Sequence, residues 1–427
     1  MQTAPLFEDV WATRRRMVDD LLAELKERAG RANDPREVRL IETHISWVLL
    51  GPEVYKIKKP VTLPFLDFSG FEERERACRA EVTINRRLAP RTYLGVVPIR
   101  RGARGRCTFG PGGPVIDWAV RMVRLADAGR ADVMLERGLL GRGQIDTLAL
   151  GIAAFHADAE AGPRIARAGE VELIERNVVD NFEALGARAA AFVSPKEAWE
   201  VQAWQLAFLR GHRELFERRI AAGAIRDGHG DLRLEHVFFT ADADFEVIDG
   251  IEFDERYRHA DVCADVAFLA MDLARLGRVD LAERFLATYA RAANDFELYR
   301  LVDFYESYRA YVRAKIAAIS VADESVSAAV RARAVEDARR YLLLSVAAGR
   351  RSLLSPVVVA VAGGIASGKS TLAERIGEEL SAPIVDADRT RKHMLGISPT
   401  VHADTAPWAG AYDPRFSERV YAEVLAR

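Results

Sequence analysis

The spacing of apolar positions divides the chain into an N-terminal part of mixed helix and strand and a longer, mainly helical part. Residues 11–30 place apolar side chains three to four positions apart, which predicts an amphipathic helix. Two short apolar segments then flank the turn Gly51-Pro52-Glu53 and predict a strand pair at 45–50 and 54–58. The elements expected next are a helix at 72–88 and strands at 96–100 and 115–125.

From residue 145 the pattern is helical, and one short β-rich stretch interrupts it at 236–240 and 245–248. Helices resume at about 262 and continue to about 349. Ser355-Pro356 then breaks the pattern, and the apolar run 357–361 predicts a further strand. A domain boundary is therefore expected near 350–356.

Composition narrows the class of protein. The chain has 427 residues, of which 49% are apolar and 29% charged, so two or three globular domains are expected. A net charge of −2 gives no general attraction to nucleic acid or to an anionic membrane. The three cysteines are far apart, and no apolar run is long enough for a membrane helix. These features predict a soluble, cytoplasmic protein without a disulfide framework or a cysteine-based zinc site.

The clearest motif opens the C-terminal segment. Gly363 to Ser370 fits the pattern GxxxxGK[ST] of a phosphate-binding P-loop, between the strand expected at 357–361 and a helix expected at 371–380. Lys369 would reach the β- and γ-phosphates of ATP, and Ser370 would hold Mg²⁺. A chance glycine-rich turn is the alternative. The nucleotide-binding residues expected here are Gly363, Gly364, Ser367, Gly368, Lys369, Ser370 and Thr371.

This segment resembles the small P-loop kinases of the gluconate-kinase and adenylate-kinase type. In such kinases a second strand ends in an acid that helps to place the acceptor, and Asp388 is the first candidate for that role, with Asp386 second. A helix cap at Asp388 is equally open. Nothing after Asp413 resembles a Walker B strand, so either a fragment of a P-loop domain or a decayed one is expected. Residues 419–427 end within a helical pattern without a cap signal, which favours a fragment.

A second candidate site lies in the β-rich stretch. Asp231 precedes the strand expected at 236–240, and Asp249 ends the strand expected at 245–248. Two strands that are each bordered by an acid can bring both carboxylates to one place. Phosphoryl transfer needs one acid to position the acceptor hydroxyl and another to hold Mg²⁺. A hairpin with helix caps and surface acids is the alternative.

His229-Gly230-Asp231, with Ile248-Asp249 behind it, resembles the catalytic and metal loops of the aminoglycoside phosphotransferase family, which has the protein-kinase-like fold. The resemblance covers roughly residues 40–320. It implies that Asp231 is the catalytic acid–base and that Asp249 is the chief Mg²⁺ ligand.

A kinase-like fold also needs a strand lysine for the α- and β-phosphates and a helix glutamate that holds it. Lys56 and Lys58 lie on one face of the strand expected at 54–58, because side chains alternate along a strand. Lys56 is preferred over Lys58. Glu81 on the following helix is the expected partner, with Glu75 as the alternative; a solvated lysine without a site is the competing interpretation.

Two departures from the family pattern bear on catalysis rather than on the fold. His236 stands where the family has an asparagine that serves as a second metal ligand, and imidazole suits softer ions than Mg²⁺. A structural role for His236 is equally open. No GxGxxG loop joins the first strands, so Thr43-His44-Ile45-Ser46 or the turn at Gly51 would have to cover the phosphates.

The stretches 43–48, 56–60, 251–254 and 261–272 resemble a bacterial two-domain family, in which an aminoglycoside-phosphotransferase-like domain precedes a C-terminal P-loop ATP-binding domain. That resemblance spans nearly the whole chain. It implies an α+β protein-kinase-like domain at 1–350, followed by the start of an incomplete α/β P-loop domain at 356–427.

The expected function is ATP-dependent phosphorylation of a small hydroxylated molecule, with ATP and Mg²⁺ as cofactors and neither nucleic acid nor membrane as a partner. The acceptor and the oligomeric state are left open. Two alternatives remain: a nucleotide-sensing pseudokinase, and a P-loop ATPase whose first domain is not catalytic.

Overall fold

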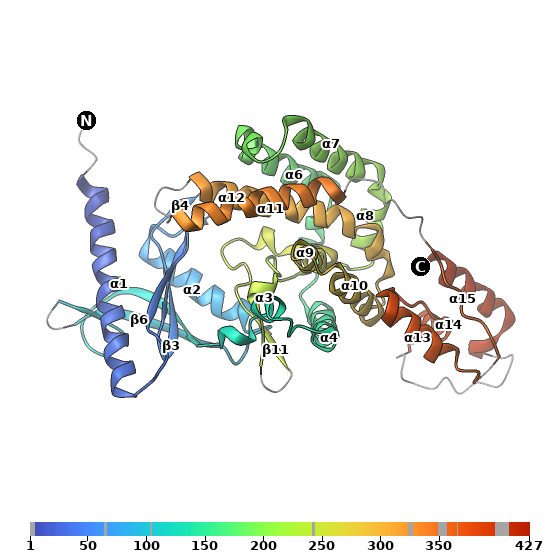
Figure 1. Cartoon of the computed structure of the whole chain (residues 1–427), viewed down its shortest axis with the longest axis horizontal. Coiled ribbons are helices and arrows are strands. Elements are labelled where there is room, and N and C mark those ends of the chain that lie inside the picture. The colour runs from blue at the N-terminus through green and yellow to red at the C-terminus, as the bar shows by residue number, and fades with distance from the viewer. Residues whose placement is uncertain are drawn as a thin grey trace. The chain divides into compact units, whose positions relative to one another are not determined.

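The chain forms two compact units in a computed structural model that describes residues 5–63, 66–102, 105–240, 244–322, 328–348, 357–364, 366–397 and 410–427 (Figure 1). Unit 1 comprises Met1–Leu139 and Asp227–Ala260, and unit 2 comprises Leu140–Arg226 and Asp261–Arg427. The division thus falls inside the kinase-like domain expected from the sequence. The boundary expected near 350–356 lies outside the described residues.

Unit 1 is built on an antiparallel sheet with the strand order β1-β2-β3-β8-β6-β7. Every neighbouring pair in this sheet is antiparallel. The strands expected at 45–50, 54–58, 96–100 and 115–125 all form, and β1 and β7 were not anticipated. The strands are β1 (Arg39–Glu42), β2 (Ser46–Leu50), β3 (Glu53–Lys58), β6 (Tyr93–Arg101), β7 (Cys107–Thr108) and β8 (Val115–Val123).

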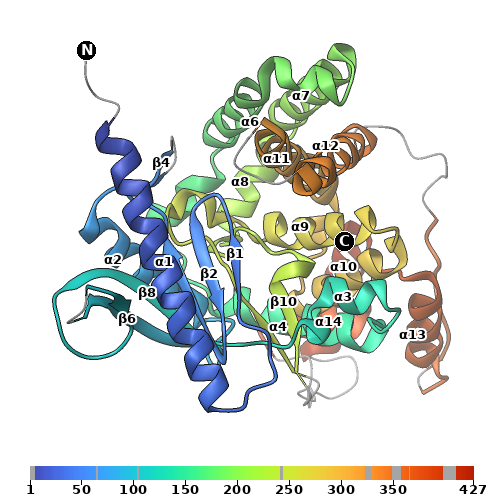
Figure 2. The same cartoon turned by 60° about the vertical axis from the view of Figure 1, so that its left-hand side comes forward.

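One helix covers each face of this sheet. Alternate residues of β3 point to opposite faces, so each face has its own apolar contacts with a helix. Tyr55 and Ile57 pack under α1 (Pro5–Arg31), which lies along the sheet in Figure 2. Val54 packs on the other side with residues of α2 (Phe71–Asn85). The α1 side is a continuous apolar core that includes Met17, Val18, Leu21, Leu25, Trp47, Leu49, Ile99 and Ala119.

A buried ionic cluster connects both helices to β8. Asp117 is 1% exposed and accepts hydrogen bonds from the Arg74 guanidinium at 2.9 and 3.2 Å. Arg14 of α1 donates to the same carboxylate. Arg74 also donates to the backbone carbonyls of Phe68, Ser69 and Gly70, which fixes the start of α2.

The rest of unit 1 is a short hairpin and several small elements. The hairpin is attached to the chain after α2, because the buried carboxylate of Glu246 accepts hydrogen bonds from Arg91 (2.7 Å) and Thr92. This attachment brings both acid-bearing loops of the hairpin region into unit 1. The elements are β4 (Thr62–Leu63), β5 (Leu66–Asp67), α3 (Ala131–Glu136), β10 (Val237–Phe239) and β11 (Phe245–Val247).

Unit 2 is helical in the residues that the structure describes, apart from the ends of β9 (Ile225–Asp227) and β12 (His259–Asp261). Helices α6, α7, α11 and α12 pack together, as Figure 1 shows. The helices of this group and its neighbours are α4 (Arg142–Asp158), α5 (Pro163–Ala166), α6 (Val171–Leu185), α7 (Pro195–Gly211), α8 (Arg213–Ala221), α9 (Val262–Arg275), α10 (Val279–Ala293), α11 (Val302–Ala322) and α12 (Ala328–Ala348).

The C-terminal segment contains α13 (Lys369–Leu380), α14 (Ala387–Met394) and α15 (Pro414–Ala426). The strand predicted at 357–361 is not formed, since no strand among the described residues pairs with it. Val357 and Val358 are 83% and 92% exposed. An extended segment forms a β-strand only when a neighbouring strand supplies partners for its backbone hydrogen bonds.

Within the described residues, no helix has both the length and the apolar character that a membrane crossing requires. Cys78, Cys107 and Cys263 are free and buried.

The ionic cluster at Asp117 gives a first prediction, on stability. Asp117→Ala should lower the free energy of unfolding by about 3–5 kcal/mol, because it leaves the buried Arg74 guanidinium without its carboxylate. Urea denaturation measures this. Glu73→Ala removes a solvent-exposed pair with Arg76 and should cost less than about 1 kcal/mol. Equal losses in the two variants would contradict the assignment of Asp117 as a buried anchor.

Candidate active site

Three elements of unit 1 meet at Lys56. Its ammonium group lies 2.9 Å from Oε1 of Glu81 on α2 and donates to Oδ1 of Asp249 after β11. The Lys56 side chain is 13% exposed and Glu81 is fully buried. The structure therefore brings together the strand lysine, the helix glutamate and the second acid that the sequence had selected.

The neighbouring lysine has a different environment. Lys58 is 0% exposed, lies 2.5 Å from Oε2 of Glu81, and also contacts Glu252. The alternative helix acid, Glu75, instead pairs with Arg79 on the exposed side of α2. Of the two lysines, Lys56 is the one whose side chain retains exposure.

Asp249 adopts a left-handed backbone conformation, with φ of 66°. This region is uncommon for residues other than glycine, although aspartate and asparagine tolerate it best. Its amide donates to the Tyr93 hydroxyl at 3.2 Å, and the next amide, of Gly250, donates to Oδ1 of Asn85 at 2.7 Å. These two side chains hold the conformation, and neither was selected from the sequence. Asn85 lies one helical turn after Glu81, and that spacing is the signal that could have found it.

The charge of Asp249 is set by its neighbours. Burial would raise the pKa of the Asp249 carboxyl, but the ammonium group of Lys56 beside it holds that pKa well below its ordinary value. The side chain is 45% exposed. Asp249 is therefore an ionised, accessible carboxylate.

The loop that carries Asp231 is fastened to the end of β11 through His229. Nε2 of His229 lies 3.1 Å from the carbonyl oxygen of Ile248, and the Asp231 amide donates to Nδ1 at 3.3 Å. Because a carbonyl oxygen only accepts, the ring carries its proton on Nε2. Gly230 has φ of 86°, and a Cβ there would lie 2.8 Å from the carbonyl oxygen of Tyr257. This glycine is needed for the loop to approach the neighbouring segment.

His236 lies between the two candidate acids. Its ring nitrogens are 3.7 Å from the Asp231 carboxylate and 3.8 Å from the Asp249 carboxylate. Nδ1 is 2.8 Å from the backbone oxygen of Asp231, and Nε2 is 3.2 Å from the guanidinium of Arg233. Since a guanidinium only donates, Nε2 presents its lone pair to Arg233.

Arg233 is the residue in this loop that the sequence did not single out. Its guanidinium donates to both carboxylate oxygens of Asp231, at 3.0 and 3.1 Å. The side chain is 8% exposed. Asp231, Arg233, His236 and Asp249 thus form one chain of polar contacts.

The two turns expected to cover the phosphates lie at opposite ends of β3. The turn before Ser46 adjoins the Lys58 end, where Ser46 pairs with Lys58 and the Lys59 amide donates to the Ile45 carbonyl at 2.8 Å. The Gly51 turn adjoins Val54 at the start of the strand.

The residues of the candidate P-loop in the C-terminal segment lead directly into α13. Gly368 has φ of 81° and precedes Lys369, so Lys369, Ser370 and Thr371 occupy the first turn of the helix. Lys369 donates to the backbone carbonyl of Gly364. Gly363 has φ of 157°, a conformation that would strain any other residue. A Cβ at this position would also lie 2.9 Å from Oγ of Ser367.

The acids that follow the P-loop have local partners. Asp386 caps α14 by accepting from the Arg389 amide at 2.7 Å, so the cap is Asp386 and not Asp388. Asp388 lies in the first turn, where its carboxylate pairs with Lys392 at 2.8 Å and is 53% exposed.

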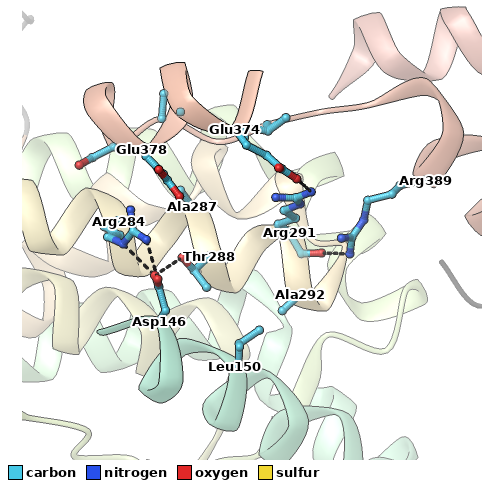
Figure 3. Close-up of a pocket in the computed structure, with 14 residues that line it drawn as sticks. Asp146, Leu150, Arg284, Ala287, Thr288, Arg291, Ala292, Glu374, Glu378 and Arg389 are labelled. Atoms are coloured by element: carbon cyan, nitrogen blue, oxygen red, sulfur yellow. Dashed lines mark hydrogen bonds and ion pairs between the residues drawn. The ribbon is translucent and has the colours of Figure 1, made fainter. Parts of the chain in front are cut away.

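A cavity of 360 Å³ lies in unit 2 between α10 and α13 (Figure 3). Arg284 donates to Asp146 at 2.8 and 2.5 Å, and Arg291 pairs with Glu374 at 3.2 Å. Arg389 donates to the Arg291 carbonyl at 2.9 Å. Each arginine thus already has an oxygen partner, and no residue of the Lys56–Asp249 site lines this cavity.

The Asp249 carboxylate fits the requirements of a magnesium ion that binds together with a nucleotide. No group of three or more His, Cys, Asp or Glu side chains in the described part of the chain is arranged to hold a metal ion. Mg²⁺, however, commonly takes one or two carboxylates and completes its shell with substrate phosphates and water. An ionised carboxylate that is partly exposed meets that requirement.

Unit 1 therefore has a kinase-like α+β architecture, with an antiparallel sheet, a lysine–glutamate pair from strand to helix, and two acid-bearing loops. No family model matches the chain. It is 33% identical over 387 residues to "Uncharacterized protein Rv2004c" of Mycobacterium tuberculosis, which covers 90% of this chain and 74% of that protein. "Uncharacterized protein Mb2027c" of Mycobacterium bovis matches with the same identity and coverage. The chain belongs to the family of these mycobacterial proteins.

Solved structures similar to the chain include small-molecule phosphotransferases. The GDP complex of aminoglycoside 2'-phosphotransferase-IIIa is 14% identical, with a TM-score of 0.39, and covers 74% of this chain and 96% of that chain. Amicoumacin kinase hAmiN is 10% identical, with a TM-score of 0.39 and coverages of 72% and 89%. Plasmodium vivax ethanolamine kinase is 11% identical, with a TM-score of 0.39 and coverages of 72% and 82%. At these scores the likeness carries no functional conclusion, which has to come from the site itself.

The lowered pKa of Asp249 gives a prediction on pH dependence. Because the pKa is lower in the folded than in the unfolded state, ionised Asp249 stabilises the fold above about pH 4, and this contribution is lost as the pH falls further. In Asp249→Asn, the difference in unfolding free energy between pH 7 and pH 3 should be smaller than in the wild type. Denaturation at both pH values measures it. An unchanged difference would contradict the ionic account of this residue.

Proposed function

We propose that the chain is an ATP-dependent phosphotransferase that acts on a small hydroxylated molecule at the Lys56–Asp249 site of unit 1. The observation that carries the proposal is the position of Lys56 between Glu81 and Asp249. A lysine held by a helix glutamate beside an acid-bearing loop is the arrangement that kinase-like enzymes use to bind nucleotide phosphates.

The residues divide the chemistry by their positions. Lys56 would bind the α- and β-phosphates while Glu81 keeps its ammonium group in place. Asp249 would hold Mg²⁺, which neutralises phosphate charge when it is bound with the nucleotide. Asp231 would accept the proton of the acceptor hydroxyl as that oxygen attacks the γ-phosphorus. The Arg233 guanidinium, which donates to both carboxylate oxygens, would hold Asp231 in place until the acceptor arrives.

A nucleotide-sensing pseudokinase is the rival with a specific observation behind it. Both oxygens of Asp231 are occupied by Arg233, and His236 stands where the related family has a second metal ligand. A protein with this arrangement would bind Mg²⁺–ATP through Lys56 and Asp249 without transferring its phosphoryl group. Turnover therefore separates the two functions, whereas binding does not.

We further propose the P-loop as a second ATP-binding site, at the start of an α/β domain. The support is local: the motif residues precede and open α13, and the first amides of a helix have no acceptor within the helix, so they can bind a phosphate. An ATPase that uses only this loop is the third candidate function.

The P-loop proposal predicts that Lys369→Ala removes one class of ATP-binding site from the full chain. Isothermal titration calorimetry with Mg²⁺–ATP should then give one site fewer than in the wild type. Lys392→Ala changes a lysine of the same segment outside the motif and should leave the number of sites unchanged. An unaltered stoichiometry in Lys369→Ala would refute a nucleotide site at the P-loop.

The kinase proposal is tested in a Lys369→Ala background, so that any remaining turnover belongs to unit 1. With an acceptor found by screening hydroxylated metabolites, Asp231→Asn should lower kcat by about 10²–10⁴, the usual share of a general base. Its affinity for Mg²⁺–ATP should stay close to that of the background protein. Asp249→Asn should instead weaken Mg²⁺–ATP binding itself.

The outcomes distinguish the three candidates. Binding without turnover in this background, across the whole acceptor screen, would favour the pseudokinase. Loss of all nucleotide binding and turnover by Lys369→Ala alone would favour the P-loop ATPase.

A further inference from the structure

Strand β3 presents two lysines to the site, Lys58 fully buried and Lys56 13% exposed, and the proposed nucleotide chemistry uses only Lys56. Lys56 and Lys58 lie on the same face of the strand and share Glu81, at 2.9 Å to Oε1 and 2.5 Å to Oε2. Each lysine has a second carboxylate of its own, Asp249 for Lys56 and Glu252 for Lys58. The result is a ladder of two ammonium groups and three carboxylates that joins β3, α2 and the loop after β11.

The two ends of this ladder differ in exposure. At the Lys56 end the Asp249 side chain is 45% exposed, whereas at the other end Lys58 and Glu252 are 0% and 5% exposed. A closed ion pair cannot reach a ligand, so Lys58 has no phosphate to bind. Burying an ammonium group is costly unless carboxylates surround it, which indicates a positional task for Lys58.

The closed pair matters most once a nucleotide is bound. Lys56 must then turn its charge toward phosphates, and Asp249 must turn toward Mg²⁺, so the contact between them is given up. Glu81 and Glu252 still share Lys58 at that point. The connection from α2 to the loop through Lys58 therefore remains after Lys56 and Asp249 have separated.

The loop needs such a link, because Asp249 is held at φ of 66°. A strained residue keeps its conformation only where its surroundings fix both sides of it. The Gly250 amide is fixed by Asn85 at 2.7 Å, and Glu252 is fixed by Lys58. Asn85 also donates to the Glu81 carbonyl at 2.9 Å, so both anchors lead back to α2.

We infer that Lys58 and Glu252 form a positioning pair that keeps the Asp249 loop in its metal-binding conformation after Lys56 has turned to the nucleotide. The inference rests on the proposed function of the Lys56–Asp249 site. If the pair has this role, it controls how much Mg²⁺ increases the affinity for ATP.

The test uses the full chain with Lys369→Ala and calorimetry with ATP, in Mg²⁺ and in EDTA. Glu252→Gln keeps the size of the side chain and removes its charge. The affinity in Mg²⁺ should fall about 10–100-fold, as is common when partners of a metal ligand are changed, while the affinity in EDTA should change less than about twofold.

A matched control is available on β11, the strand that leads into the Asp249 loop. Glu246 is 1% exposed and contacts Arg91 and Thr92 rather than either lysine. Glu246→Gln is the same substitution, three residues before Asp249, and should lower the melting temperature without changing the ratio of the two affinities. Equal loss of Mg²⁺ dependence in both variants would overturn the inference, because it would show a general effect of loosening the hairpin.

A second variant keeps the test valid if Glu252→Gln does not fold. Lys58→Met/Glu252→Met replaces the pair by apolar side chains of similar volume, a change that buried pairs often tolerate. It should fold and lose the Mg²⁺ dependence of ATP binding in the same way. Wild-type Mg²⁺ dependence in folded Glu252→Gln or in the double variant overturns the positioning role. Absence of Mg²⁺-dependent binding in the Lys369→Ala parent would instead overturn the proposed function.

Discussion

Two lysine ammonium groups on one strand, one fully buried and one mostly buried, are the constraint to which the rest of unit 1 conforms. Each requires carboxylates within contact distance, and the three that supply them come from α2 and from the loop after β11. Moving either element away would leave a charge in the interior without a partner, at a cost of several kcal/mol per ion. The position of α2 and the left-handed turn at Asp249 both meet that requirement.

The sequence predicts most of this arrangement because its signals are local. Alternation along β3 places Lys56 and Lys58 on one face, and the helical repeat offers Glu81 as a partner. The sequence analysis prefers Lys56 over Lys58, but it does not predict that Lys58 is enclosed, since that difference lies in burial: one end of the ladder is open and the other closed. The roles of Asn85, Tyr93 and Arg233 also escaped prediction, because each depends on contacts made only after the loops are folded.

The C-terminal segment shows where local signals are insufficient. The motif from Gly363 to Ser370 precedes and opens α13 as expected, yet the strand expected at 357–361 does not form. Strand formation is a property of a pair, and an apolar sequence alone does not supply the neighbour. The cap at Asp386 instead of Asp388 is a smaller case, in which two acids spaced two residues apart both satisfied the sequence rule.

The central claim is that Mg²⁺–ATP binds at the Lys56–Asp249 site of unit 1. Hydrogen–deuterium exchange on the full chain, with and without saturating Mg²⁺–ATP, tests it most directly. The account predicts slower exchange in peptides that cover β3 and residues 249–252, whatever happens at the P-loop. Slower exchange confined to peptides that cover Gly363–Thr371 would contradict it.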